Sequence, residues 1–318
     1  MEEKEINRTP YANSVFEQPW WLDLVAPGKW DEVTVKDGER VIARLPYVLD
    51  NGIISNPVYT QTLGIWLDDS LKTYQRGNAH LHAQKEVIAE LLSALPKHKG
   101  MSVTFDSATK YILPFRWHGF RIEPTFSYRI NDLSDMAAVT ANISKSTAKK
   151  LTPARKKLTV KEDCPELVEL MVALQNKTFA RQGRSNPNDN ALTARIMSGA
   201  IEAGHGKIIM ACGDDGEPHS ASFLLYDDKV CYDLISGQDP AHKNDNSNEL
   251  VLDESIKFAA TVSKAFDFEG SMVEGIEHFF SKFGGDQIVN YHVSRQSALR
   301  DIMDVMKPRI KNMIGYKN

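Results

Sequence analysis

The chain of 318 residues has no apolar run that approaches the roughly 20 residues of a membrane-spanning helix. Its opening, MEEKEINRTPY, is acidic and polar, whereas a secretory signal peptide begins with positive charge and continues with an apolar stretch. From both absences we expect a cytoplasmic protein without membrane insertion. Cysteine is also scarce, since Cys164, Cys212 and Cys231 form an odd, widely spaced set. This pattern predicts buried free thiols rather than a disulfide framework.

Several catalytic signatures are missing as well. The sequence contains no nucleophile elbow, no phosphate-binding P-loop and no dinucleotide fingerprint. His80 and His82 are separated by one residue, but no acidic side chain or thiol lies close by in the sequence. We therefore expect no metal site.

The net charge of −4 conceals a local excess of positive charge. A dedicated nucleic-acid binder is usually basic over a whole domain, which this chain is not. The segment 145–161 nevertheless lacks acidic residues, and Pro153 within it predicts two helical pieces rather than one. A local nucleic-acid contact therefore stays open, through the basic residues Lys145, Lys149, Lys150, Arg155, Lys156, Lys157 and Lys161.

The length predicts two domains of roughly 150 residues each. Asp37-Gly38 and Asp215-Gly216 both lie between alternating apolar residues, which is a strong hairpin signal. After its hairpin, each half continues with a helix, a strand, a short helix and a last strand. This order predicts an α+β fold that occurs twice. We expect domains over residues 1–135 and 136–298, with a helix over 299–318 that docks back onto the body.

Four segments together resemble one known family. They are FEQPWWLDLV at 16–25, ARKKLTVKED at 154–163, the strand, polar loop and helix at 232–259, and FDFEGSMVEGIEHFFSKFGG at 266–285. The chain resembles the acyltransferases of the GNAT superfamily, and more closely their FemAB-like branch. The resemblance implies two tandem GNAT-like domains with the acyl-CoA N-acyltransferase fold. Each would be a mixed, mostly antiparallel sheet flanked by helices.

The resemblance also implies an activity. The expected reaction is N-acyl transfer from acetyl-CoA or another acyl-CoA to the amine of a small molecule or an amino-sugar, without a metal. A FemAB-type transfer from aminoacyl-tRNA to a peptidoglycan precursor and a non-catalytic binding protein are the alternatives. Where the family usually has a Phe-Lys pair, this chain has Phe279-Phe280, with Lys282 two places later. This difference speaks against the tRNA-dependent reaction.

The donor would bind where the third expected strand meets the next helix. Single-domain relatives use a Gln/Arg-x-x-Gly-x-Gly/Ala loop there, whereas this chain has no second glycine before the helix. Backbone amides at a helix N-terminus attract an anion even without glycine. Asn246 with Glu249 is also compatible with an ordinary helix cap. The donor-binding residues implied by the resemblance are Ser236, Gly237, Gln238, Asn246, Ser247 and Asn248.

Direct acyl transfer to an amine needs a base for the ammonium proton and can use an acid for the leaving group. If FDFEGS at 266–271 is a strand, Asp267 and Glu269 lie on one of its faces. Glu269 is the first candidate for the base or for a ligand of the acceptor ammonium, and Asp267 is the second. Tyr291 resembles the tyrosine that acts as general acid in some relatives. A solvated or capping carboxylate and a buried strand tyrosine are the alternative interpretations.

Three further residues are candidates for contact with the substrate. Trp21 belongs to a Trp pair that predicts core packing or a ligand-facing wall. Arg181 and Arg184 belong to RQGRSNPNDN at 181–190, a loop rich in turn-forming residues.

Overall fold

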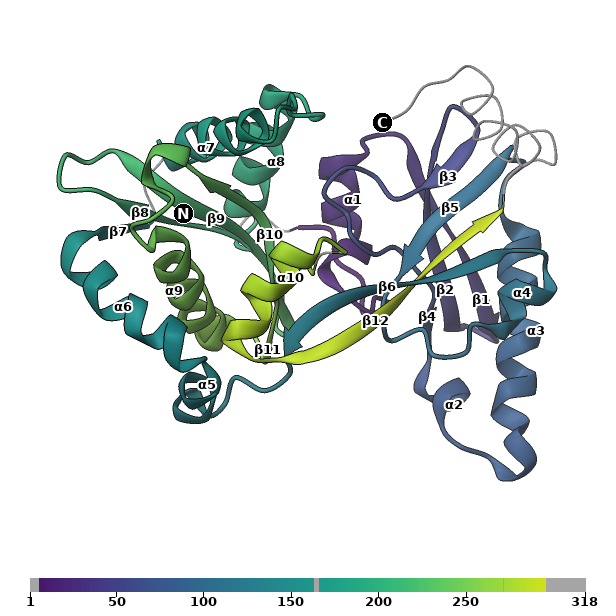
Figure 1. Ribbon diagram of the computed structural model, residues 1–318. Helices are drawn as coiled ribbons and strands as arrows, with labels where there is room; N and C mark the ends of the chain where they lie inside the picture. Colours follow the sequence, from purple (N-terminus) through teal and green to yellow (C-terminus); the bar gives the residue numbers. More distant parts are fainter. Residues whose placement is uncertain (1–5, 163–165, 271, 296–318) are drawn as a thin grey trace, which may run out of the picture. The chain divides into compact units, whose positions relative to one another are not determined.

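The computed structural model describes residues 6–162, 166–270 and 272–295, and the chain divides into two compact units (Figure 1). Of the described residues, the first unit, which we call the C-unit, comprises 6–8, Gln18–Val25 and those within Thr125–Val289. The second, the N-unit, comprises Thr9–Glu17, Ala26–Pro124 and residues 290–295.

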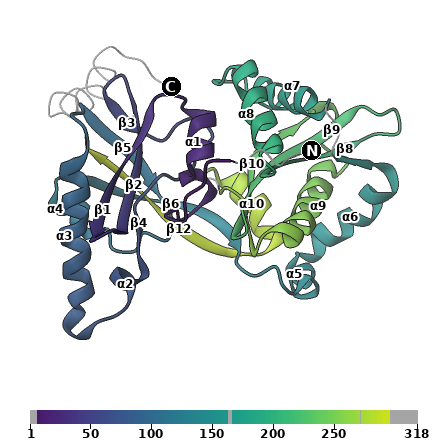
Figure 2. The ribbon, with the colours of Figure 1, turned by 180° about the vertical axis from the view of Figure 1, so that it is seen from behind.

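The N-unit is built around a hairpin and the long helix α3. Figure 2 shows α3 beside the strands of this hairpin, and its apolar residues Val87, Ile88 and Leu91 are buried in the unit's core. The elements of this unit are β1 (Trp30–Asp37), β2 (Arg40–Asp50), β3 (Ile53–Ser55), β4 (Trp66–Leu67), α2 (Asp69–Lys72), α3 (Ala79–Ala94), β5 (Gly100–Phe105) and α4 (Leu113–Trp117).

The C-unit places α7 and α8 on one face of its sheet and α9 on the other (Figure 1). Its elements are α1 (Pro19–Val25), α5 (Met136–Asn142), α6 (Lys145–Lys157), β7 (Thr159–Glu162), α7 (Leu167–Arg181), α8 (Asn190–Glu202), β8 (Gly206–Cys212), β9 (Pro218–Tyr226), β10 (Val230–Gln238), the 3-10 turn η3 (Pro240–His242), α9 (Ser247–Val262), β11 (Ala265–Asp267), α10 (Glu274–Phe280) and the 3-10 turn η4 (Ser281–Phe283).

Both units follow the same pairing scheme, which confirms the expected α+β fold in two copies. In the N-unit, β1, β2 and β3 are antiparallel neighbours and β3 then pairs in parallel with β5. In the C-unit, β8, β9 and β10 are antiparallel neighbours and β10 then pairs in parallel with β11. The hairpins expected at Asp37-Gly38 and Asp215-Gly216 are both present.

The last strand of each unit comes from the other half of the sequence. Strand β6 (Arg121–Ile130) pairs with β11 of the C-unit through Arg129 and Ile130. Strand β12 (Asp286–Arg295) pairs with β5 of the N-unit from Tyr291 to Arg295. The units are therefore not simply the two halves expected at 1–135 and 136–298. The expected helix at 299–318 lies outside the described residues.

Two local expectations have a clear outcome. The basic segment forms one helix, α6, and not two pieces, although it contains Pro153. Burial of Leu151 and Ala154 on either side of the proline keeps the helix packed as a unit. Cys212 and Cys231 are buried free thiols as expected, whereas Cys164 lies outside the described residues. None of the helices in the described ranges has the length and apolarity that crossing a membrane requires.

Candidate functional site

The C-unit contains a cavity of about 220 Å³ whose lining comes entirely from this unit. It lies between the end of β10, the last turn of α7, the first turns of α9, and α10. Its lining combines polar side chains with apolar side chains of α9 and α10. The lining residues are Thr178, Arg181, Gln182, Ser220, Ala221, Ser222, Asp233, Ser236, Gly237, Gln238, Asn248, Val251, Leu252, Ile276, Phe279 and Phe280.

Asp233 is the buried carboxyl group of this cavity, with 5% of its surface exposed. Burial raises its pKa to about 6, against the lowering effect of hydrogen bonds from Ser222 and Ser236. The Ser236 hydroxyl lies 3.2 and 3.3 Å from the two carboxylate oxygens. A carboxyl group with such a pKa is mostly ionised at pH 7 but takes up a proton readily, which suits a general base.

A β-bulge explains why Asp233 and Ser236 meet. Their separation of three positions would point them to opposite faces of a regular strand. The register of β10 against β9 shifts between Asp233 and Ile235, so that one extra residue is inserted in β10. After this insertion the Ser236 hydroxyl reaches the Asp233 carboxylate on the cavity side.

Gly237 allows α7 to pack tightly on β10. A Cβ at this position would lie 2.8 Å from the Leu174 side chain and 2.8 Å from the backbone nitrogen of Gln175. At the next residue, the Gln238 backbone N–H donates to the Thr178 hydroxyl of α7 at 2.9 Å. Gly237 is therefore required by the contact with α7, and this contact shapes the wall of the cavity.

The cavity brings together four of the six residues expected at the donor site: Ser236, Gly237, Gln238 and Asn248. The other two, Asn246 and Ser247, are not among its lining residues. Asn246 does occupy the N-cap position of α9, but its backbone is left-handed (φ 66°) and its side chain makes no capping hydrogen bond. Asp245 instead accepts the Ser247 backbone N–H at 2.8 Å. Glu249, the expected partner in that cap, forms an ion pair with Lys150 at 2.6 Å.

Asp267 is held in a buried ion pair outside the cavity lining. Its carboxylate accepts from the Arg129 guanidinium at 2.8 Å, from the Ser127 hydroxyl, and from the Glu269 backbone N–H at 2.8 Å. Strand β11 ends at Asp267, and Glu269 follows in a left-handed conformation (φ 55°). The two carboxylates therefore do not lie on one face of a strand as expected. Neither lines the described cavity.

The remaining candidates lie in different places. Arg181 lines the cavity, and its guanidinium lies 3.4 Å from the Gln238 side-chain oxygen. Arg184 is exposed in the loop after α7 and does not line the cavity. Trp21 is completely buried in α1, which agrees with its core-packing interpretation. Tyr291 belongs to the N-unit, where it pairs with Phe105 of β5 and packs against the core.

The sequence did not indicate the residues that give the cavity its chemistry. In the alternating pattern of its strand, Asp233 occupies a position expected to face the core. The β-bulge beside it places its side chain in the lining of the cavity. Phe279 and Phe280 occupy the place of the family's Phe-Lys pair, and both aromatic rings line the cavity. A buried acidic residue in an otherwise apolar strand, here CYDLI, was the available signal for Asp233.

Comparisons with known proteins agree with this fold. Residues 142–279 match the family model described as "Acetyltransferase (GNAT) domain". A comparison with curated proteins finds no match. Among solved structures the chain is similar to FemX, with 12% identity, a TM-score of 0.68, and coverage of 89% of this chain and 92% of that one.

Two further solved structures share the fold over nearly their whole length. L-PGS from Bacillus licheniformis has 9% identity and a TM-score of 0.55, with 97% of this chain and 98% of that one covered. A tandem GNAT protein from the clavulanic acid biosynthesis pathway has 10% identity and a TM-score of 0.52, with 91% and 89% covered. Together with the match of residues 142–279, they support the GNAT/FemAB-like fold expected from the sequence.

Proposed function

We propose that this protein, a GNAT-type acyltransferase, transfers an acyl group from acyl-CoA to the amine of a small molecule or amino-sugar in the cavity of the C-unit. The observation that carries the proposal is Asp233, a buried carboxyl group with a pKa of about 6 in the wall of a cavity beside the first turn of α9. A proton acceptor and an anion-attracting helix end then border one space, as transfer from a charged thioester donor to an ammonium group requires.

The cavity fits the acyl-thioester end of such a donor. Its volume of about 220 Å³ and its apolar wall suit a short acyl chain. Asn248, in the first turn of α9, brings the positive end of the helix dipole to the cavity, where it favours the anionic part of the donor. Gly237 packs against α7 and gives no glycine cradle for phosphate, so the helix end and Arg181 supply the attraction.

A larger cavity of the C-unit suits the donor less well. It measures about 510 Å³ and is lined by three carboxylates, Asp132, Asp135 and Asp286, with Arg129 as a basic residue. Carboxylates repel the phosphates of coenzyme A. The cavity at Asp233 is therefore the better site for the reaction.

The proposed chemistry at Asp233 is proton transfer during direct attack. Asp233 first attracts the acceptor ammonium group and then accepts a proton from the nitrogen, which frees its lone pair. The nitrogen forms a bond to the acyl carbon and the carbon–sulfur bond breaks. The second proton that the nitrogen loses passes through water to the leaving thiolate. Ser222 and Ser236 hold the carboxylate in place through their hydroxyl groups.

Release of free CoA in the presence of a panel of amines and amino-sugars tests this proposal. We expect Asp233→Asn to lower kcat by about 100-fold or more, the typical contribution of a general base. Asp228→Asn, which removes an exposed carboxylate in the β9–β10 turn, is the matched control and should retain full activity. Activity of Asp233→Asn within twofold of the wild type would exclude Asp233 as the base. Donor binding without turnover of any amine would favour the non-catalytic alternative.

Transfer from aminoacyl-tRNA is the second candidate function, and α6 is the observation in its favour. Six of its residues are basic and exposed, and none of its residues is acidic: Lys145, Lys149, Lys150, Arg155, Lys156 and Lys157. Lys150 and Arg155 already form ion pairs with α9, which reduces the charge left for phosphates.

A tRNA-binding measurement at several salt concentrations separates the two functions. If α6 binds tRNA, charge reversal at Lys149, Lys150, Arg155 and Lys156 should weaken binding and flatten its salt dependence, because fewer counterions are released. Unchanged tRNA affinity in this variant would exclude the second function, while acyl-CoA turnover stays a separate readout.

A further inference from the structure

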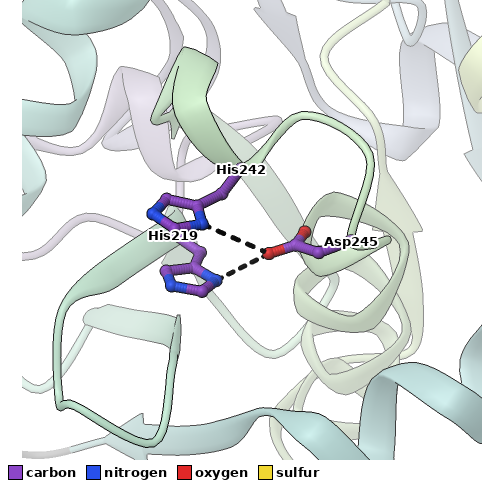
Figure 3. A group of neighbouring side chains, drawn as sticks. All are labelled: His219, His242 and Asp245. Atoms are coloured by element: carbon purple, nitrogen blue, oxygen red, sulfur yellow. Dashed lines mark hydrogen bonds and ion pairs between the residues drawn. The ribbon is translucent and has the colours of Figure 1, made fainter.

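Two histidines and an aspartate converge beside the loop that joins β10 to α9. His219 lies on β9, His242 ends the η3 turn, and Asp245 follows three residues later (Figure 3). One ligand atom from each lies within 4.8 Å of the others. His219 Nδ1 is 2.6 Å and His242 Nδ1 is 4.0 Å from the same oxygen of Asp245. None of the three lines the cavity at Asp233.

The backbone around these side chains is held by its own hydrogen bonds. The carbonyl of His219 accepts the Asp239 N–H at 2.9 Å, and the carbonyl of His242 accepts the Asp245 N–H at 3.3 Å. The second carboxylate oxygen of Asp245 accepts the Ser247 N–H at the start of α9. A carboxylate fixed in this way presents its other oxygen in a defined direction, as the outer contacts of metal ligands do.

We propose that His219, His242 and Asp245 bind a divalent transition-metal ion, with zinc as the best match. Imidazole nitrogen and carboxylate oxygen are both zinc ligands, at about 2.0–2.2 Å from the ion. Ligand atoms around a tetrahedral ion are then about 3.4 Å apart. The two measured separations, 2.6 and 4.0 Å, lie on either side of this value. A water molecule completes the fourth position.

Binding needs one imidazole to turn. The two rings are stacked with centroids 3.5 Å apart and planes inclined by 8°, so their lone pairs do not yet converge on one point (Figure 3). The His219 ring is buried, so the surrounding side chains hold its orientation. His242 is partly exposed in a short turn, so its ring is free to rotate. The geometry therefore assigns the movement to His242.

The ion would join three separate elements of the C-unit. It would tie β9 to η3 and, through Asp245, to the first residue of α9. The loop between β10 and α9 lacks the second glycine of the family pattern. A metal ion bound by its residues would hold the loop in one conformation without that glycine. The sequence predicted no metal site because His80 and His82 are its only histidines at close spacing, whereas His219 approaches His242 and Asp245 only in the fold.

Zinc titration of the untagged, chelator-treated full chain by calorimetry tests this site, with metal analysis of the dialysed protein. We expect one equivalent of Zn²⁺, and binding at least tenfold weaker in His242→Ala. His278→Ala removes an exposed histidine of α10 and should bind like the wild type. Asp245→Asn provides a second test, and thermal melts without metal show whether each variant is folded.

Two results would overturn the site. One is the absence of stoichiometric Zn²⁺ in the wild type, which would mean that the three residues form only a hydrogen-bonded cluster. The other is equal affinity in wild type and His242→Ala. Neither result depends on substrate, so a failure of the acyl-transfer proposal can be told apart from a failure of the metal site. A visible spectrum with Co²⁺ in place of Zn²⁺ reports the coordination geometry independently.

Discussion

Two buried carboxyl groups have pKa values close to neutral, one in each unit. Burial raises the pKa of Asp233 in the C-unit to about 6, and this residue borders the proposed reaction space. Burial raises the pKa of Glu17 in the N-unit to about 7, and this residue is completely buried. In both cases burial is the largest cause, because a charged group loses its hydration. Because of their positions, ionisation of Asp233 should affect the reaction rate, whereas ionisation of Glu17 should affect the stability of the fold.

The rate should depend on the ionisation of Asp233. Only the ionised carboxylate accepts a proton, so kcat/KM should rise with pH and level off above an apparent pKa of about 6. Asp233→Asn should remove this acidic limb, whereas the limb that belongs to the acceptor amine should persist. Steady-state CoA release from pH 5 to 9 measures both limbs. An acidic limb that survives in Asp233→Asn would assign the titration to another group.

Stability should depend on the ionisation of Glu17. Its folded-state pKa is raised from 4.5 to about 7, so its stabilising contribution is complete below pH 4.5 and is lost as pH rises through about 7. The loss amounts to about 3 kcal/mol of unfolding free energy. Glu17→Gln should flatten the fall of melting temperature between pH 5 and 8.

The pH slope, and not the absolute stability, is the informative quantity for Glu17. Its carboxylate accepts backbone N–H groups of Asn13 and Gly64, and a glutamine accepts through one oxygen only. The variant therefore has a constant cost in addition to its changed slope. Glu39→Gln, at an exposed turn, should keep the wild-type slope. An unchanged slope in Glu17→Gln would contradict the assignment.

The sequence could predict part of the site at this scale. Ser236, Gly237, Gln238, Asn248 and Arg181 were candidates and do line one cavity. Asp233 could not be singled out, since a bulge cannot be read from alternation and its aspartate occupies a core position. Asp267 and Glu269 were misplaced because the strand that would align them ends at Asp267.

At the scale of elements, the contact between α7 and β10 shapes the cavity wall. Gly237 lets the strand approach the helix, and the Thr178 hydroxyl receives the Gln238 N–H across the contact. Elements with a strong local signal were predictable, such as the two hairpins with Asp-Gly turns. Elements fixed by packing were not, including the short β11 and the unbroken α6.

A methyl group at Gly237 should disturb this contact. Gly237→Ala places a Cβ 2.8 Å from backbone and side-chain atoms of α7, and overpacking of this kind costs about 1–3 kcal/mol. We expect a lower melting temperature and weaker donor binding. Gly275→Ala on α10 is the control, because a Cβ there meets nothing within 4 Å and alanine favours the helix. Equal melting temperatures for Gly237→Ala and wild type would contradict the tight contact.

At the scale of the whole chain, two units repeat one pairing scheme and each contains a strand from the other half of the sequence. The repeat was predictable because the order of hairpin, helix and strands recurs. The exchange of β6 and β12 was not, since long-range pairing leaves no mark on local periodicity. A matching fold alone also does not determine a substrate. The functional claim therefore depends on the cavity of the C-unit and must be tested there.

Hydrogen–deuterium exchange with and without acetyl-CoA tests that claim most directly, because it locates the donor without knowledge of the acceptor. Bound donor should slow exchange in the segment 239–252 and in α10, which flank the cavity, and leave α3 and β5 of the N-unit unchanged. Unaltered exchange at millimolar donor, or protection confined to the N-unit, would contradict the proposed acyl-CoA site.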